Sequence, residues 1–151
     1  MNTKPLIIFD IDGVLANIDR RAAYIECDKP DWQKFYNKHE IAKDLPVKPM
    51  IAIYNHFLQT AEVEIWTGRQ KSTELITRQW LQKHTAGLPS ALRMRPNDNR
   101  MTNLDLKREF MTHSKRKPAM AFDAQPGTAE LWHKRGVQVC YCVHPYVKEE
   151  A

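Results

Sequence analysis

The chain has 151 residues, of which 42% are hydrophobic and 27% are charged, a balance typical of one folded domain rather than a disordered chain. No apolar run approaches the length of a membrane span, and the N-terminus lacks the layout of a signal peptide. The three cysteines show no CxxC spacing, which argues against a disulfide framework or a zinc site and leads us to expect a reducing cytoplasm.

Strands and helices alternate along the chain. Apolar, β-branched and aromatic runs predict strands over 6–10, 62–66, 91–94, 119–122 and 137–143. Helical spacing and end signals predict helices over 49–60, 72–85, 104–113 and 128–135. The alternation predicts a single α/β domain over 1–151, with a parallel sheet of about five strands sandwiched by helices. Residues 14–48 form an irregular, partly helical insert after the first strand.

The first strand runs into Asp10-Ile11-Asp12-Gly13. Alternation within a strand turns the side chains of Asp10 and Asp12 to the same side, at the carboxyl end where open α/β sheets bind ligands. Two neighbouring carboxylates repel unless a cation lies between them, and Mg²⁺ suits such oxygen ligands. The alternative interpretation is an ordinary Asp-Gly turn after a strand.

Further polar signals follow the later strands. Thr67-Gly68-Arg69 follows the second strand, Lys107 lies in the helix after the third, and Asp123 follows the fourth. Each alone can be a turn or an exposed residue, but their recurrence at one end of the sheet suits phosphoryl transfer. A carboxylate can attack phosphorus and a second acid can move the proton. A hydroxyl and a lysine can offset the charge on the phosphoryl oxygens.

This order of motifs resembles the haloacid dehalogenase (HAD) superfamily of phosphatases. From Leu6 to about Val143, the chain resembles more closely the 3′-phosphatase domain of the phage polynucleotide kinase–phosphatase and its bacterial relatives. The matching pieces are IFDIDGVLA at 8–16, Arg20-Arg21, DWQKFY at 31–36, LPVKP at 45–49, IWTGR at 65–69, MRPNDNR at 94–100, LKRE at 106–109 and AELWHKRGV at 129–137.

The resemblance implies a role for each matching residue. Asp10 would be the nucleophile, and Asp12 the general acid and base, with its backbone carbonyl also reaching Mg²⁺. Thr67 would bind the phosphoryl group, and Lys107 would stabilise the phosphoaspartate. The implied metal ligands are Asp10, Asp12 and Asp123. The implied substrate-binding residues are Arg21, Gly68, Arg69, Arg95 and Arg100.

Two departures from the family pattern concern the metal site. The family has a DDRP-like run after the fourth strand, whereas this chain reads DAQP at 123–126, with Ala124 in place of an acid. Relatives also carry acids shortly before the lysine, where this chain has Asn103 and Leu104, with Asp105 as a nearby substitute. Three explanations of Ala124 stay open: a natural variation in which Asp123 suffices, an engineered knock-out, or a decayed enzyme.

The substrate is inferred from the insert and from charge. In the HAD superfamily an insert of this length forms a small cap, which leaves the site open to large substrates. Residues 93–117 carry an excess of basic side chains in segments expected near the site, which favours a nucleic-acid 3′ end. The aromatic residues Trp32, Phe35 and Tyr36 either stack on a base or pack within the cap.

We therefore expect a Mg²⁺-dependent phosphomonoester hydrolase that forms an aspartyl phosphate and removes 3′-phosphates from nucleic-acid ends. One alternative is a 5′(3′)-nucleotidase acting on nucleoside monophosphates. Another is an inactive binder of nucleic acid or nucleotides. The sequence predicts no membrane partner and leaves the oligomeric state open.

Overall fold

The five predicted strands form one parallel sheet in the computed structural model, which describes residues 3–143. The strands are β1 (Leu6–Phe9), β4 (Glu62–Gln70), β5 (Ala91–Arg95), β6 (Met120–Asp123) and β7 (Gln138–Tyr141). Their order across the sheet is β5-β4-β1-β6-β7, and every neighbouring pair is parallel. The carboxyl ends of β4, β1 and β6 therefore lie next to one another in the middle of one edge.

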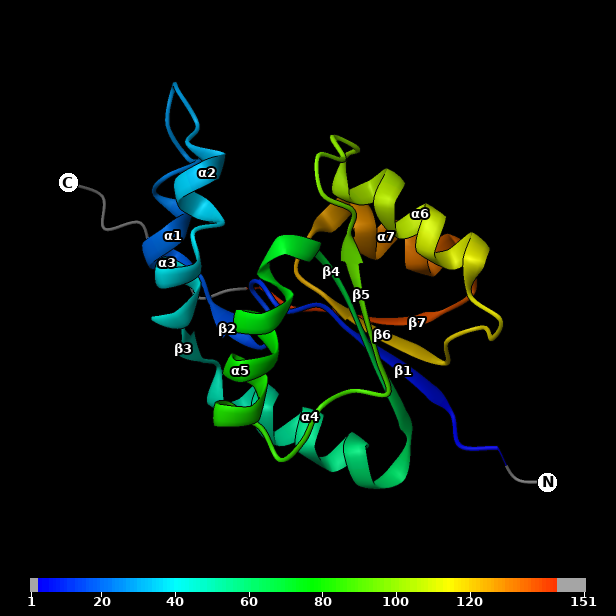
Figure 1. Ribbon diagram of the computed structural model, residues 1–151. Coiled ribbons are helices and arrows are strands. Elements are labelled where there is room, and N and C mark those ends of the chain that lie inside the picture. Colours follow the sequence, from blue (N-terminus) through cyan, green and yellow to red (C-terminus); the bar gives the residue numbers. More distant parts are fainter. Residues whose placement is uncertain (1–2, 144–151) are drawn as a thin grey trace.

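Helices cover both faces of the sheet (Figure 1). The four long helices are α4 (Lys48–Thr60), α5 (Glu74–His84), α6 (Asn103–His113) and α7 (Pro126–Lys134). Alternation in β1 sends Phe9 into a core shared with α4 and α5, and Ile8 into a second core shared with α6 and α7. The predicted α/β sandwich is confirmed. Within residues 3–143, no helix is long and apolar enough to cross a membrane.

The insert folds into a small lobe at the left of Figure 1. Its elements are β2 (Ala16–Asn17), α1 (Asp19–Ala22), α2 (Trp32–Phe35), α3 (Lys38–Ala42) and β3 (Leu45–Pro46). Because β2 and β3 pair antiparallel, the chain enters and leaves the insert through one two-stranded ribbon.

Two strand ends differ from the sequence prediction. β4 continues through Thr67-Gly68-Arg69 to Gln70, with a register shift between Thr67 and Gln70. The strand continues because β5 offers a partner as far as Arg95. β1 instead ends at Phe9, so Asp10 and Asp12 lie beyond the regular strand.

The basic run does not form one surface. Residues 115–117 lie between α6 and β6, at the amino edge of the sheet, because α6 carries the chain back along the sheet away from the carboxyl ends. Arg116 there pairs with Glu62, the first residue of β4, and donates to the carbonyl oxygen of Lys4. The expectation that the whole of 93–117 lies near the site is wrong for this segment.

Candidate active site

Three of the predicted residues meet around one buried ammonium group. Lys107, on the first turns of α6, places Nζ 3.3 Å from Asp10 Oδ2 and 3.5 Å from Asp123 Oδ2. The same Nζ donates to the carbonyl oxygen of Trp66 at 2.6 Å. Strand ends of β1 and β6 thus present two carboxylates to a cation delivered by the helix after β5.

The charges of this group depend on one another. Burial, together with the charges of Asp123 and Asp12, raises the pKa of Asp10 to about 6, against the opposing effect of Lys107. Burial acts to lower the pKa of Lys107, but Asp10 and Asp123 outweigh it and raise that pKa. Lys107 is therefore held as a cation beside Asp10.

Asp12 has different partners. Its Oδ1 accepts from Arg69 Nη2 at 2.6 Å and from Arg21 Nη2 at 2.8 Å. Burial acts to raise the pKa of Asp12, but Arg69 and Arg21 outweigh it, and the pKa is lowered. The side chains of Asp10 and Asp12 do not face one another as strand alternation predicted, because β1 ends at Phe9, before both residues. Each carboxylate has a cationic partner of its own.

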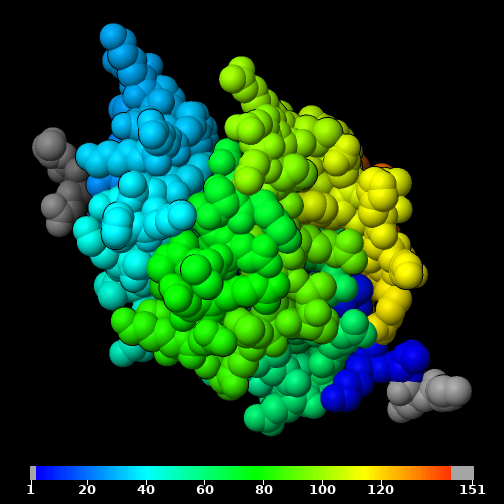
Figure 2. All heavy atoms as spheres, in the orientation of Figure 1, coloured from blue at the N-terminus to red at the C-terminus, as the bar shows by residue number. Residues whose placement is uncertain are grey.

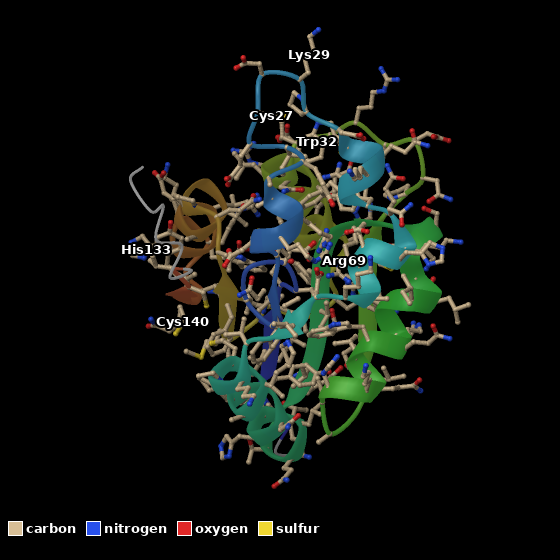
Figure 3. All side chains as sticks on the ribbon, turned by 90° about the vertical axis from the view of Figure 1, so that its left-hand side faces the viewer. Cys27, Lys29, Trp32, Arg69, His133 and Cys140 are labelled. Carbon is tan, nitrogen blue, oxygen red and sulfur yellow. The ribbon has the colours of Figure 1, made fainter. Side chains whose placement is uncertain are left out.

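A second acid, Asp44, completes the arginine pair, and sequence reasoning missed it. Its buried carboxylate accepts from Arg21 Nε at 2.9 Å and Nη2 at 2.7 Å, and from Arg69 Nη2 at 3.4 Å. Trp80 Nε1 donates to its backbone carbonyl at 2.8 Å. Figure 3 shows Arg69 in the interior of the molecule, between the insert and the sheet. Asp44 lies at the end of the insert, where no motif spacing marked it.

Thr67, Gly68 and Arg95 form the β4 side of the site. The buried Thr67 hydroxyl accepts from the backbone N–H of Arg69 at 3.2 Å. Arg95 is buried, and it donates to the Gly68 carbonyl at 3.0 Å and to Asn103 Oδ1 at 2.7 Å. A Cβ added at Gly68 would lie 2.4 Å from Asn103 Oδ1, so a larger residue there would displace the Asn103 side chain. Arg95 thereby fixes the loop that precedes α6.

The predicted substrate-binding arginines differ in exposure. Arg21 and Arg69 are fully buried and direct their donors at Asp12, Asp44, Thr77 and the carbonyl oxygen of Phe35. Arg100 is exposed and makes no hydrogen bond or ion pair with any described residue.

The carboxylates of Asp10 and Asp123 fit a magnesium site. Mg²⁺ in proteins uses one or two carboxylates together with water and substrate phosphate, and these two already converge on a cation. Among residues 3–143, no group of three acidic, histidine or cysteine side chains could hold a metal. The Asp12 carboxylate is engaged by arginines. Asp105 pairs with Arg108 at the exposed start of α6 and does not substitute for the missing acids.

The sequence matches the model of a known protein family. A model of the polynucleotide kinase PNKP phosphatase domain matches residues 4–145. The chain belongs to this family. It is a HAD-type phosphatase domain, as the order of motifs predicted. No relative is found among the curated proteins.

Solved structures share the fold. In one structure of the Pnkp1/Rnl/Hen1 complex, the matching chain is 19% identical with a TM-score of 0.73, and the match covers 95% of this chain and 47% of that one. A haloacid dehalogenase-like hydrolase from Streptococcus pneumoniae is 12% identical, with a TM-score of 0.65 and coverage of 93% and 85%. A class C acid phosphatase from Bacillus anthracis with tungstate bound is 13% identical, with a TM-score of 0.65 and coverage of 96% and 68%. The chain spans less than half the length of its match in the Pnkp1/Rnl/Hen1 complex.

Asp44→Asn should weaken both the fold and catalysis. Removing this charge leaves two buried guanidinium groups short of a counterion, a change that costs about 3 kcal/mol of unfolding free energy. Loosened arginines should also lower kcat. Urea denaturation and phosphate release measure the two effects, with Glu74→Gln as the control because Glu74 forms ion pairs only at the surface of α5. Wild-type stability of Asp44→Asn would show that the arginines do not need this anchor.

Proposed function

We propose that the domain is a Mg²⁺-dependent phosphatase that removes 3′-phosphates from nucleic-acid ends through an aspartyl phosphate on Asp10. The observation that carries the proposal is that Asp10 and Asp12 have different charged neighbours. Asp10 faces the Lys107 ammonium, whereas Asp12 is held by Arg21 and Arg69. Two neighbouring carboxylates in different environments suit the roles of nucleophile and proton carrier.

In the first step, an oxygen of the Asp10 carboxylate attacks phosphorus, and the bond from phosphorus to the sugar 3′-oxygen breaks. Asp12 gives the departing oxygen its proton. A phosphate dianion bound beside Asp12 opposes the effect of the arginines and favours the protonated carboxyl that this step needs. Lys107, 3.3 Å from Asp10, offsets the negative charge that gathers on the phosphoryl oxygens.

In the second step, Asp12 takes a proton from water, and the oxygen of that water attacks the phosphorus of the aspartyl phosphate. The bond from Asp10 to phosphorus breaks, which releases inorganic phosphate and restores Asp10. We assign Arg21 and Arg69 to positioning Asp12 rather than to contacting substrate, because both side chains are fully buried and point at protein oxygens.

Asp10 and Asp123 are the side chains that would hold Mg²⁺, with the backbone carbonyl of Asp12 as a third ligand. The ion, when bound, would supply positive charge that draws the phosphate toward Asp10. The protein's own contribution is to keep the two carboxylates buried and directed at one point, through Lys107 and the indole N–H of Trp132, which donates to Asp123 Oδ2 at 3.3 Å.

Phosphate release from a panel of substrates tests the proposal. The panel holds a 3′-phosphorylated oligonucleotide and the 3′- and 5′-mononucleotides, each with Mg²⁺. The oligonucleotide should be the preferred substrate. Asp10→Asn should lower turnover by a factor on the order of a thousand or more, because the amide keeps the shape but is a poor nucleophile. Asp105→Asn is the control, since Asp105 is exposed at the start of α6.

Three other results would contradict parts of this proposal. Preference for mononucleotides would favour a nucleotidase. Binding of oligonucleotide without hydrolysis of any substrate would favour the inactive binder. Activity of Asp10→Asn comparable to that of the parent would remove Asp10 as the nucleophile.

Ala124→Asp should strengthen Mg²⁺ binding by about tenfold, the lower end of the effect of a supporting carboxylate at a metal site. A Cβ on Gly13 would lie 2.9 Å from Ala124 Cβ, so this side chain faces the loop that carries Asp10 and Asp12. Isothermal titration with Mg²⁺ measures the change without relying on activity. Ala124→Asn has nearly the same size without the charge and is the matched control. Equal affinity of the two variants would mean that Asp123 alone suffices.

A further inference from the structure

A groove of about 1040 Å³ separates the insert from the loop that joins β5 to α6. Residues of α2 and α3 form one wall, and residues 95–103 form most of the other. Figure 2 shows the surface hollowed between the blue and cyan insert and the yellow-green loop. The groove therefore lies at the carboxyl edge of the sheet, where the candidate active site is.

An aromatic platform stands on the insert side. Trp32 lines the groove and is 54% exposed, in the upper part of Figure 3. Its ring stacks with that of Tyr36, with centroids 6.3 Å apart and planes at 21°. Phe35 is buried and packs against both, so it supports the stack from within the insert. Exposed aromatic rings of this kind bind nucleobases without regard to sequence.

The charge along the groove is positive. Lys38 and Arg100 line it from opposite walls, both are exposed, and neither forms an ion pair with a residue that the structure describes. Of the described residues that line the groove, none is acidic. Unpaired cations on both walls suit a chain of phosphates that passes between them.

One end of the groove adjoins the candidate site. Arg95 and Asn103 line it and also contact Gly68 of the site. Tyr36 lines it as well, and burial raises the pKa of its hydroxyl to about 12, with the charge of Asp12 adding to the effect. Because Tyr36 also stacks with Trp32, the aromatic platform continues along this wall of the groove.

We propose that the groove binds the unpaired nucleotides that precede the terminal 3′-phosphate. One base stacks on Trp32, and backbone phosphates lie near Lys38 and Arg100. A base must be unpaired to stack in this way, so the groove selects single-stranded ends over blunt duplexes and over mononucleotides. This inference rests on the proposed function, because it assigns a substrate class to the same site.

Steady-state kinetics of Trp32 variants give the first test. Trp32→Ala should raise KM for a single-stranded 3′-phosphorylated oligonucleotide by about tenfold, the effect of losing one stacked base. KM for p-nitrophenyl phosphate should not change, and kcat for both substrates should be preserved. Trp32→Phe keeps a stacking ring and should recover most of the loss. Leu75→Ala is the control, because Leu75 is an exposed apolar residue on α5 that does not line the groove.

Fluorescence gives a second test that needs no catalysis. Trp66, Trp80 and Trp132 are buried, so a base stacked on Trp32 should quench the one exposed indole of the chain. Single-stranded oligonucleotide should quench the tryptophan fluorescence of the Asp10→Asn variant, whereas a blunt duplex and a mononucleotide should not.

The salt dependence of oligonucleotide affinity tests the role of Arg100. Arg100→Gln should lower the slope of this dependence by about 0.7 units, whereas Lys83→Gln, an exposed change on α5, should leave it unchanged.

The two proposals fail in different ways. If no substrate is hydrolysed but single strands still quench Trp32, the proposed activity is wrong and the groove assignment stands. If Trp32→Ala leaves KM for the oligonucleotide unchanged, or if duplex and mononucleotide quench Trp32 fluorescence as strongly as single strands do, the groove assignment is wrong. The proposed phosphatase activity is then unaffected.

Discussion

The contact on which the site depends is the pair of buried arginines that meets one oxygen of Asp12. Arg21 and Arg69 approach Asp12 Oδ1 at 2.8 and 2.6 Å, and together they neutralise this carboxylate. Lys107 pairs instead with Asp10 and Asp123. Two aspartates one residue apart thereby gain different electrostatic surroundings, which is what a nucleophile and a proton carrier require.

The same contact joins the insert to the sheet. Arg21 and Asp44 belong to the insert, Arg69 belongs to β4, and Asp12 belongs to the loop after β1. Buried charges are costly unless they are paired, so these groups hold one arrangement of insert and sheet. The insert that completes this cluster also carries Trp32. The insert therefore contributes both to the positioning of Asp12 and to one wall of the groove.

Much of this could be predicted from the sequence, and the reason is topological. Asp10 follows β1 and Asp123 ends β6. Parallel strands bring their carboxyl ends to one edge, so the position of both acids near the helix that carries Lys107 could be predicted. The partners of Asp12 were not, because they depend on where β1 ends and on side-chain directions outside regular strands. Asp44 lies in an irregular segment without a motif. Residues 115–117 were misplaced because their position depends on the direction in which α6 carries the chain.

Mass spectrometry of protein quenched with acid during turnover tests the division of roles most directly. The peptide that spans residues 8–16 contains both aspartates, and fragmentation separates a phosphoryl group on Asp10 from one on Asp12. With a 3′-phosphorylated oligonucleotide and Mg²⁺, we expect the adduct on Asp10, beside the lysine. An adduct on Asp12, or steady turnover with neither aspartate phosphorylated at any quench time, would contradict the account.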